Sequence, residues 1–121
     1  MSISVLSAGR DLSLLTKRSE VLSQLGCSVT PVVNSADLVN TFFDGDYDLI
    51  VICSSIPPDE RRKILMLVKH YRPTMHAILV SDFADQSSAY ELPSLGVRVA
   101  PEPTALIHAV SRSFPELPRP I

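Results

Sequence analysis

Short apolar runs alternate with longer amphipathic segments along the whole chain, and this alternation limits the folds that it can adopt. Five runs have the length and composition of strands: residues 3–7, 27–33, 47–53, 76–81 and 97–100. Each is followed by a segment with apolar side chains at helical spacing: residues 11–25, 35–43, 57–72, 85–95 and 104–114. Five strand–helix repeats predict an α/β fold, in which helices cover both faces of a parallel sheet.

Several residues predict where the helices begin and end. Asp11 and Ser35 stand where a helix N-cap is expected, because their side-chain oxygens can accept a hydrogen bond from the first turn. Gly26 fits the left-handed position that ends a helix, and Gly45 closes the second one. Pro93 prevents the fourth helix from being long and regular, because proline removes a backbone donor and clashes with the preceding turn.

The strands differ in how deeply they should lie. Residues 47–53 form the most hydrophobic run, and consecutive Val and Ile indicate burial on both faces, as in a central parallel strand. Pro31 cannot donate a hydrogen bond to a neighbour, so the strand of residues 27–33 should lie at an edge or carry a bulge.

Helical spacing predicts which side chains face the core. In the first helix the inward face comprises Leu14, Leu15, Val21, Leu22 and Leu25. In the third helix it comprises Ile64, Leu65, Leu67, Val68 and Tyr71. Basic side chains are concentrated on this third helix and are interpreted as a solvated face: Arg61, Arg62, Lys63, Lys69 and Arg72.

Length and composition favour one globular domain. The chain has 121 residues, of which 45 % are hydrophobic and 20 % charged. This is enough apolar side chain for a core that needs no disulfide bond or structural metal. A formal net charge of −2 argues against broad nucleic-acid binding, which needs a basic face. No secretory signal and no apolar run of membrane-spanning length is present, so we expect a cytoplasmic protein that does not enter a membrane.

Neither the cysteines nor the histidines have the spacing of a metal site. Cys27 and Cys53 are far apart in sequence and are expected to be free thiols. The histidines, at positions 70, 76 and 108, are expected to lie at the surface or to support other side chains without binding a metal themselves. A cysteine-phosphatase loop is excluded, because Asp59 stands where it requires arginine, and no glycine-rich phosphate cradle follows the first strand.

Several landmarks make residues 3–114 resemble response-regulator receiver domains of the chemotaxis-Y-like type. The run "DLIVIC" continues as "SSIP", with Pro57 four residues beyond the place of the family's phosphoacceptor. Ser81 ends the fourth strand where the family has Ser or Thr, and Glu102–Pro103 follows the fifth strand where the family has Lys–Pro. The resemblance implies a flavodoxin-like (βα)5 three-layer sandwich with strand order 2-1-3-4-5, and leaves residues 115–121 as a proline-rich tail or linker stub.

Carried over residue by residue, the resemblance implies that the phosphorylation site has been lost. The acid pair that holds magnesium in the family falls on Ser7 and Ala8, and the phosphoacceptor aspartate falls on Cys53. The hydroxyl position is kept as Ser81, while the lysine falls on Glu102. Magnesium prefers carboxylate oxygens, and Glu102 would repel a phosphoryl group. We therefore expect a degenerate receiver, a pseudo-receiver, with no metal, no cofactor and no enzymatic activity.

The resemblance also implies a surface for a partner. In receivers the fourth helix, fifth strand and fifth helix commonly contact a second copy or an effector. Here that face would contain Tyr90, Leu95, Val97, Val99, Leu106 and His108. Val99 replaces the family's switch aromatic, so one fixed conformation is expected. A cis peptide bond at Glu102–Pro103 would favour common descent over chance similarity.

Three alternatives to a phosphorylation-independent interaction module stay open. Cys53 could serve as a thiol-based redox sensor, because a strand end beside a helix start can lower a thiol pKa, although Glu102 opposes this. A receiver phosphorylated at a non-standard group is a second alternative. A small flavodoxin-like binding domain of unrelated function is the third.

Overall fold

The computed structural model describes residues 3–53, 55–80, 97–99 and 103–114. Its five strands are β1 (Ile3–Ala8), β2 (Cys27–Val32), β3 (Leu49–Cys53), β4 (His76–Val80) and β5 (Val97–Val99). Its helices are α1 (Leu12–Gln24), α2 (Ser35–Asp44), α3 (Pro58–Tyr71) and α4 (Pro103–Ser113). All the strands pair in parallel in the order β2-β1-β3-β4-β5, which confirms the predicted sheet.

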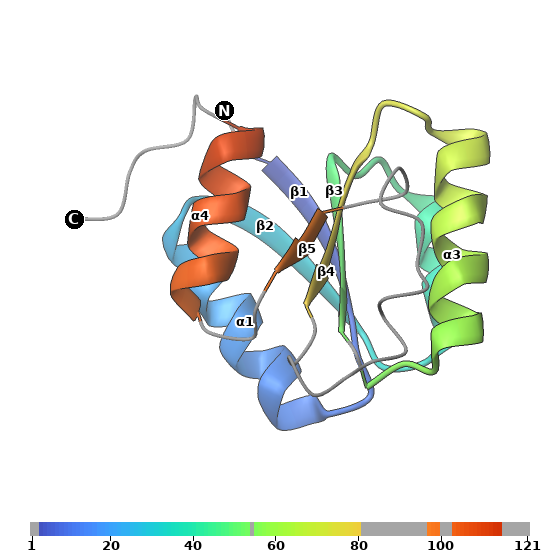
Figure 1. Ribbon diagram of the computed structural model, residues 1–121, viewed down its shortest axis with the longest axis horizontal. Helices are drawn as coiled ribbons and strands as arrows, with labels where there is room; N and C mark the ends of the chain where they lie inside the picture. Colours follow the sequence, from blue (N-terminus) through green and yellow to red (C-terminus); the bar gives the residue numbers. More distant parts are fainter. Residues whose placement is uncertain (1–2, 54, 81–96, 100–102, 115–121) are drawn as a thin grey trace.

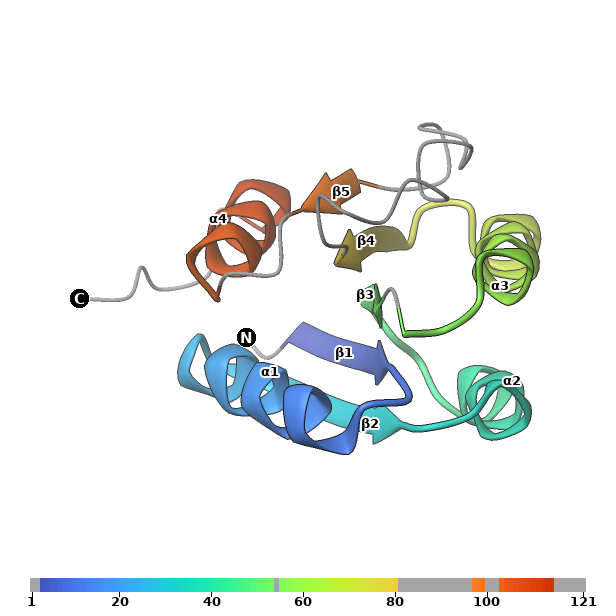
Figure 2. The ribbon, with the colours of Figure 1, turned by 60° about the horizontal axis from the view of Figure 1, so that its bottom comes forward.

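The helices form a layer on each face of the sheet. Helices α1 and α4 cover one face and α2 and α3 cover the other, as Figure 2 shows. The side chains divide accordingly into two apolar cores, one under each helix pair. Residues of β1 and β3 alternate between the two cores, which is the two-residue period expected of a strand buried on both sides.

The depth of each strand agrees with its sequence. Every residue of β3 is at most 3 % exposed, so the most hydrophobic run is the central strand (Figure 1). Strand β2 lies at one edge of the sheet, where Pro31 is the register partner of Ser7 on β1. The prediction of an edge strand at Pro31 is confirmed.

The helix boundaries show which local signals dominate. Asp11 caps α1 by accepting a hydrogen bond from the Leu14 N–H at 3.2 Å, and Gly26 beyond its end has φ 89°, as predicted. The prediction that Ser35 caps α2 is wrong. Asn34 is the N-cap, because it is the last residue with an extended backbone, and its Oδ1 accepts from the N–H of Asp37 at 2.8 Å.

Two apolar side chains are more exposed than predicted, and two arginines are buried. Leu14 and Tyr71 are exposed, at 40 % and 57 %, because each lies at the border of its helix's apolar stripe. Arg61 was expected in solvent but is fully buried, and Arg18 is only 9 % exposed on the inward face of α1. Burial of a charged side chain requires compensating polar contacts, so Arg18 and Arg61 each need polar partners inside the fold.

Some predictions fall outside the described residues. These are the helix at 85–95, Ser81, the Glu102–Pro103 bond and the tail at 115–121. Within the described part of the chain, no helix combines the length and the apolar content that crossing a bilayer requires.

Candidate functional site

The place of the family's phosphoacceptor is occupied by a buried thiol. Cys53 is the last residue of β3, and its side chain is 3 % exposed. Leu49 and Val51 of the same strand lie in the core under α1 and α4, so the strand period puts Cys53 on that face. The carboxyl end of a parallel strand is where α/β proteins of this class place their functional groups.

The loop after β1 closes over this thiol. An ideal Cβ on Gly9 would lie 3.0 Å from the Cβ of Cys53, so the two backbones approach as closely as a glycine permits. The Arg10 N–H donates to Ser55 Oγ at 2.9 Å, which ties the loop after β1 to the loop after β3. An exposed ion pair between Arg10 and Glu60, 2.9 Å long, lies across the same two segments.

A buried guanidinium approaches the thiol from the helix above. Burial disfavours ionisation of Cys53, but hydrogen bonds with the side chain and backbone of Ser55 and with Arg18 favour the thiolate. The positive charge of Arg18 acts in the same direction, and together these contacts hold the pKa of Cys53 below the usual value for a thiol. Cys27 has no such partner and burial alone raises its pKa, so the two free cysteines differ in character.

The other residues predicted for the site are only partly brought together. Ser7 is buried at 1 % exposure on the face that Cys53 shares, and its Oγ has no hydrogen-bond partner among the described residues. Ala8 points to the opposite face, into the core under α2 and α3. Gly9, which follows this pair, lies directly against Cys53. Ser81 and Glu102 lie outside the described residues.

Arg18 is the functional residue that the sequence reasoning missed. Its position was readable, because Leu15, Arg18, Leu22 and Leu25 follow the three- and four-residue spacing of a single helix face. The search for an inward face considered only apolar side chains and therefore passed over a buried cation.

The residues around Cys53 do not fit the magnesium ion that the receiver fold implies. The groups that lower the pKa of Cys53 are the side chain and backbone of Ser55 and the guanidinium of Arg18, and none is a carboxylate. Throughout the described ranges, no group of three or more His, Cys, Asp or Glu side chains is arranged to hold a metal.

The face that the resemblance implies for a partner is only partly described. Leu106 cannot belong to it, because it is 2 % exposed and packs in the core between α4 and the sheet. His108 is exposed on α4, and Val97 and Val99 pair with β4 through their backbones. Tyr90 and Leu95 lie outside the described residues.

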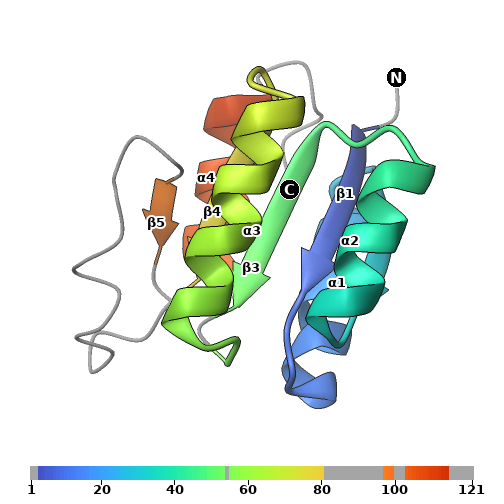
Figure 3. The same ribbon diagram turned by 90° about the vertical axis from the view of Figure 1, so that its right-hand side faces the viewer.

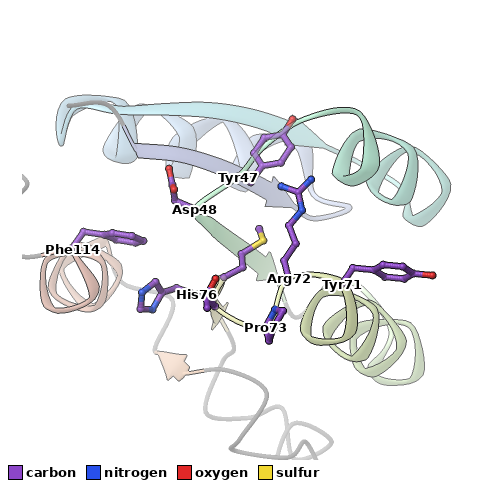
Figure 4. Close-up of a pocket in the computed structure, with 9 residues that line it drawn as sticks. Tyr47, Asp48, Tyr71, Arg72, Pro73, His76 and Phe114 are labelled. Atoms are coloured by element: carbon purple, nitrogen blue, oxygen red, sulfur yellow. The ribbon is translucent and has the colours of Figure 1, made fainter.

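A separate cleft of about 460 Å³ lies at the other end of the sheet, where β3 and β4 begin (Figure 4). Two of its charged side chains have partners within the chain. Asp48 accepts a hydrogen bond from the Ser4 N–H at 2.9 Å, and Arg72 bonds Asp46 at 3.1 Å while covering the ring of Phe42. The ring of Phe114 packs against His76 at 4.8 Å between centroids.

Several solved structures of receiver domains share this architecture. No protein-family model and no curated protein matches the chain. A CheY-like receiver domain protein from Methanospirillum hungatei JF-1 superposes with a TM-score of 0.83 at 18 % identity, over 96 % of each chain. The chemotaxis response regulator CheY4 of Vibrio cholerae has a TM-score of 0.81 at 13 % identity, over 94 % of this chain and 100 % of that one.

A putative pilus assembly protein, cpaE, from Burkholderia thailandensis E264 is also similar. It has a TM-score of 0.74 at 26 % identity, over 94 % of this chain and 99 % of that chain. The chain thus has the CheY-like form of the flavodoxin-like fold that these structures share.

Proposed function

We propose that this chain is a degenerate receiver that binds other proteins in bacterial signal transduction without being phosphorylated. The observation that carries the proposal is the state of the acceptor position. Cys53 is buried, Gly9 lies close against it, and among the described residues the charged group that lowers its pKa is the cation of Arg18. In this proposal the domain keeps the receiver fold, but the phosphoacceptor residue has been replaced and its position is buried.

The chemistry of phosphotransfer supports this reading. A receiver aspartate attacks phosphorus with a carboxylate oxygen while magnesium neutralises the phosphoryl oxygens. At Cys53 the nucleophile would be a sulfur, and the described residues around it form no carboxylate site for magnesium, so the usual transition state would lack both its oxygen nucleophile and its Lewis acid. We accordingly propose a protein with no enzymatic activity of its own.

The likeness to the pilus assembly protein cpaE is consistent with an interaction role. That protein is a putative pilus assembly protein, and assembly of a pilus depends on protein contacts. We also propose a cytoplasmic location, because receivers act inside the cell.

The test is a search for phosphorylation. Amide NMR spectra of the protein are recorded before and after addition of magnesium and acetyl phosphate, with an active receiver treated identically as the control. We expect no shift in this chain and clear shifts in the control. Amide shifts around Cys53, or a retarded band in a phosphate-affinity gel, would show that the position still accepts phosphate and would refute the proposal.

A thiol sensor is the second candidate, and the lowered pKa of Cys53 favours it. In the step concerned the Cys53 thiolate attacks one oxygen of hydrogen peroxide and the O–O bond breaks. Sulfenic acid forms on the sulfur, which loses two electrons, and hydroxide leaves. At 3 % exposure the sulfur is shielded, so we expect the reaction to be slow.

This second candidate has its own measurement. The rate of thiol modification by peroxide is compared between the wild-type protein, Cys53→Ser and Cys27→Ser. A rate that depends on Cys53, and is faster than that of a denatured control at the same pH, supports a sensor. Equal rates in both variants would exclude it.

A further inference from the structure

Two exposed aromatic side chains meet at the ends of α2 and α3. Phe43 is 51 % and Tyr71 57 % exposed, and their rings contact edge to face at 5.1 Å between centroids. The ring of His70 contacts Tyr71 at 4.8 Å, and Met66, one turn earlier on α3, is 52 % exposed. Clusters of large apolar side chains on the surface mark contact sites more often than isolated ones do.

The two helices beside this aromatic cluster carry opposite charge. Helix α2 contains two acidic residues and no basic residue, and both acids, Asp37 and Asp44, are exposed. Helix α3 contains four basic and two acidic residues, and its exposed bases are Arg62 and Lys63. A surface with one acidic and one basic helix complements a second copy of itself.

The direction of the helices decides how two such surfaces can meet. Both α2 and α3 return antiparallel to the strands, so they run side by side in the same direction, as Figure 3 shows. A two-fold axis parallel to the helices places α2 of each copy over α3 of the other. An axis across the helices would place α2 over α2 and bring aspartates against aspartates. The charges therefore select the parallel arrangement.

The positions along the helices agree with the parallel arrangement. Phe43 and Tyr71 both lie at the C-terminal ends of their helices, so the aromatic pairs of the two copies meet around the axis. Asp37 lies about 9 Å before Phe43 and Lys63 about 12 Å before Tyr71, at about 1.5 Å per residue. Asp37 of one copy is then within one helical turn of Lys63 of the other.

We propose that two copies of this chain form a symmetric dimer through the surface made by Phe43, Met66, His70 and Tyr71. Asp37 of each copy pairs with Lys63 of the other. This surface lies on the helices α2 and α3, and it is distinct from the face around α4 and β5 that the resemblance to receivers implies. The proposal rests on the proposed role as an interaction module and names a second copy as the partner.

The experiment measures self-association of the whole chain by analytical ultracentrifugation over a range of concentrations. We expect a dimer for the wild type and a monomer for Phe43→Ser, whose exposed side chain can be removed without opening the core. Asp37→Lys and Lys63→Asp should each weaken the dimer about tenfold, because each turns two symmetric attractions into repulsions. The double variant should recover wild-type association.

Matched controls use the opposite face of the sheet. Glu20→Lys and Lys17→Asp change the same charges on exposed positions of α1 and should leave association unchanged. Circular dichroism checks that every variant is folded.

Three results would overturn the proposal. One is a wild-type chain that is monomeric up to about 100 µM, a weak affinity for any specific dimer. Another is a double variant that stays dissociated, and the third is a monomer that binds a different protein through Phe43. If the chain is monomeric and does not respond to acetyl phosphate, only the proposed dimer is refuted. If the chain is a dimer and does respond to acetyl phosphate, only the proposed independence of phosphorylation is refuted.

Discussion

Adding one methyl group at Gly9 tests whether the phosphoacceptor position is sealed. The new Cβ of Gly9→Ala would lie 3.0 Å from the Cβ of Cys53, whereas carbon atoms in contact normally lie about 3.5–4.0 Å apart. The ends of β1 and β3 must therefore separate by about 0.5 Å or more. Hydrogen bonds from the Gly9 N–H to Val32 O at 3.1 Å and from the Arg10 N–H to Ser55 Oγ at 2.9 Å resist that movement.

The expected loss of stability follows from two opposing terms. Overpacking of this kind costs about 1–3 kcal/mol. Alanine also restricts the unfolded chain, which returns about 0.4–1 kcal/mol. The net loss in the free energy of unfolding should be about 1–2 kcal/mol, or a fall of several degrees in Tm for a domain of this size.

Gly45→Ala is the matched control, measured with Gly9→Ala by urea denaturation. Its Cβ would also be crowded, at 3.1 Å from the ring of Tyr47, but that ring is the far end of a half-buried side chain and can turn away. We expect Gly45→Ala to stay within about 0.5 kcal/mol of the wild type or to be slightly more stable. If Gly9→Ala is as stable as Gly45→Ala, the ends of β1 and β3 can separate, and the phosphoacceptor position at Cys53 is not closed.

Four further outcomes are expected. Arg18→Met should raise the pKa of Cys53, measured by titrating the ultraviolet absorbance of the thiolate; an unchanged titration would show that Arg18 does not contact the sulfur. The folded state favours the Cys53 thiolate, so this group's stabilisation is complete above the pKa of the unfolded thiol and is lost as pH falls through the folded pKa. The difference in the free energy of unfolding between the wild type and Cys53→Ser should therefore grow with rising pH in denaturation curves. A difference that does not change with pH would contradict a lowered pKa of Cys53 in the folded state. Leu22→Ala should lose about 2–5 kcal/mol in the same assay, because Leu22 is 0 % exposed, and a loss below 1 kcal/mol would mean that the core under α1 can collapse. Asn34→Ala should lose about 0.5–2 kcal/mol by removing the cap of α2, and no loss would imply that another group replaces it.

The architecture was predictable from the sequence because its signals are redundant. The order of the elements rests on five repeats of the same pattern, so an error at one boundary leaves the topology unchanged. The choice between Asn34 and Ser35 as a cap had no such redundancy. Both residues cap helices well, and only the backbone conformation, extended at Asn34, separates them.

The site was less predictable because its decisive features are exceptions to average behaviour. Charged residues usually lie in solvent, so Arg61 was assigned outward by type rather than by its position on the helix, and Arg18 was not considered for the inward face. The alignment of Cys53 with the acceptor could be read along the chain. The approach of Gly9 to Cys53 could not, because it depends on the register between β1 and β3, which neither strand specifies alone.

Pro31 on β2 has a consequence for how copies of the domain can associate. The Gly9 N–H donates to the carbonyl of Val32, so Val32 directs its polar backbone groups toward β1, and those of Pro31 point away from the sheet. The missing N–H therefore removes no bond inside the sheet, but takes a donor from the open edge to which another strand would attach. Growth of the sheet from copy to copy is discouraged at this edge. Association between copies is thereby directed to the helical surfaces.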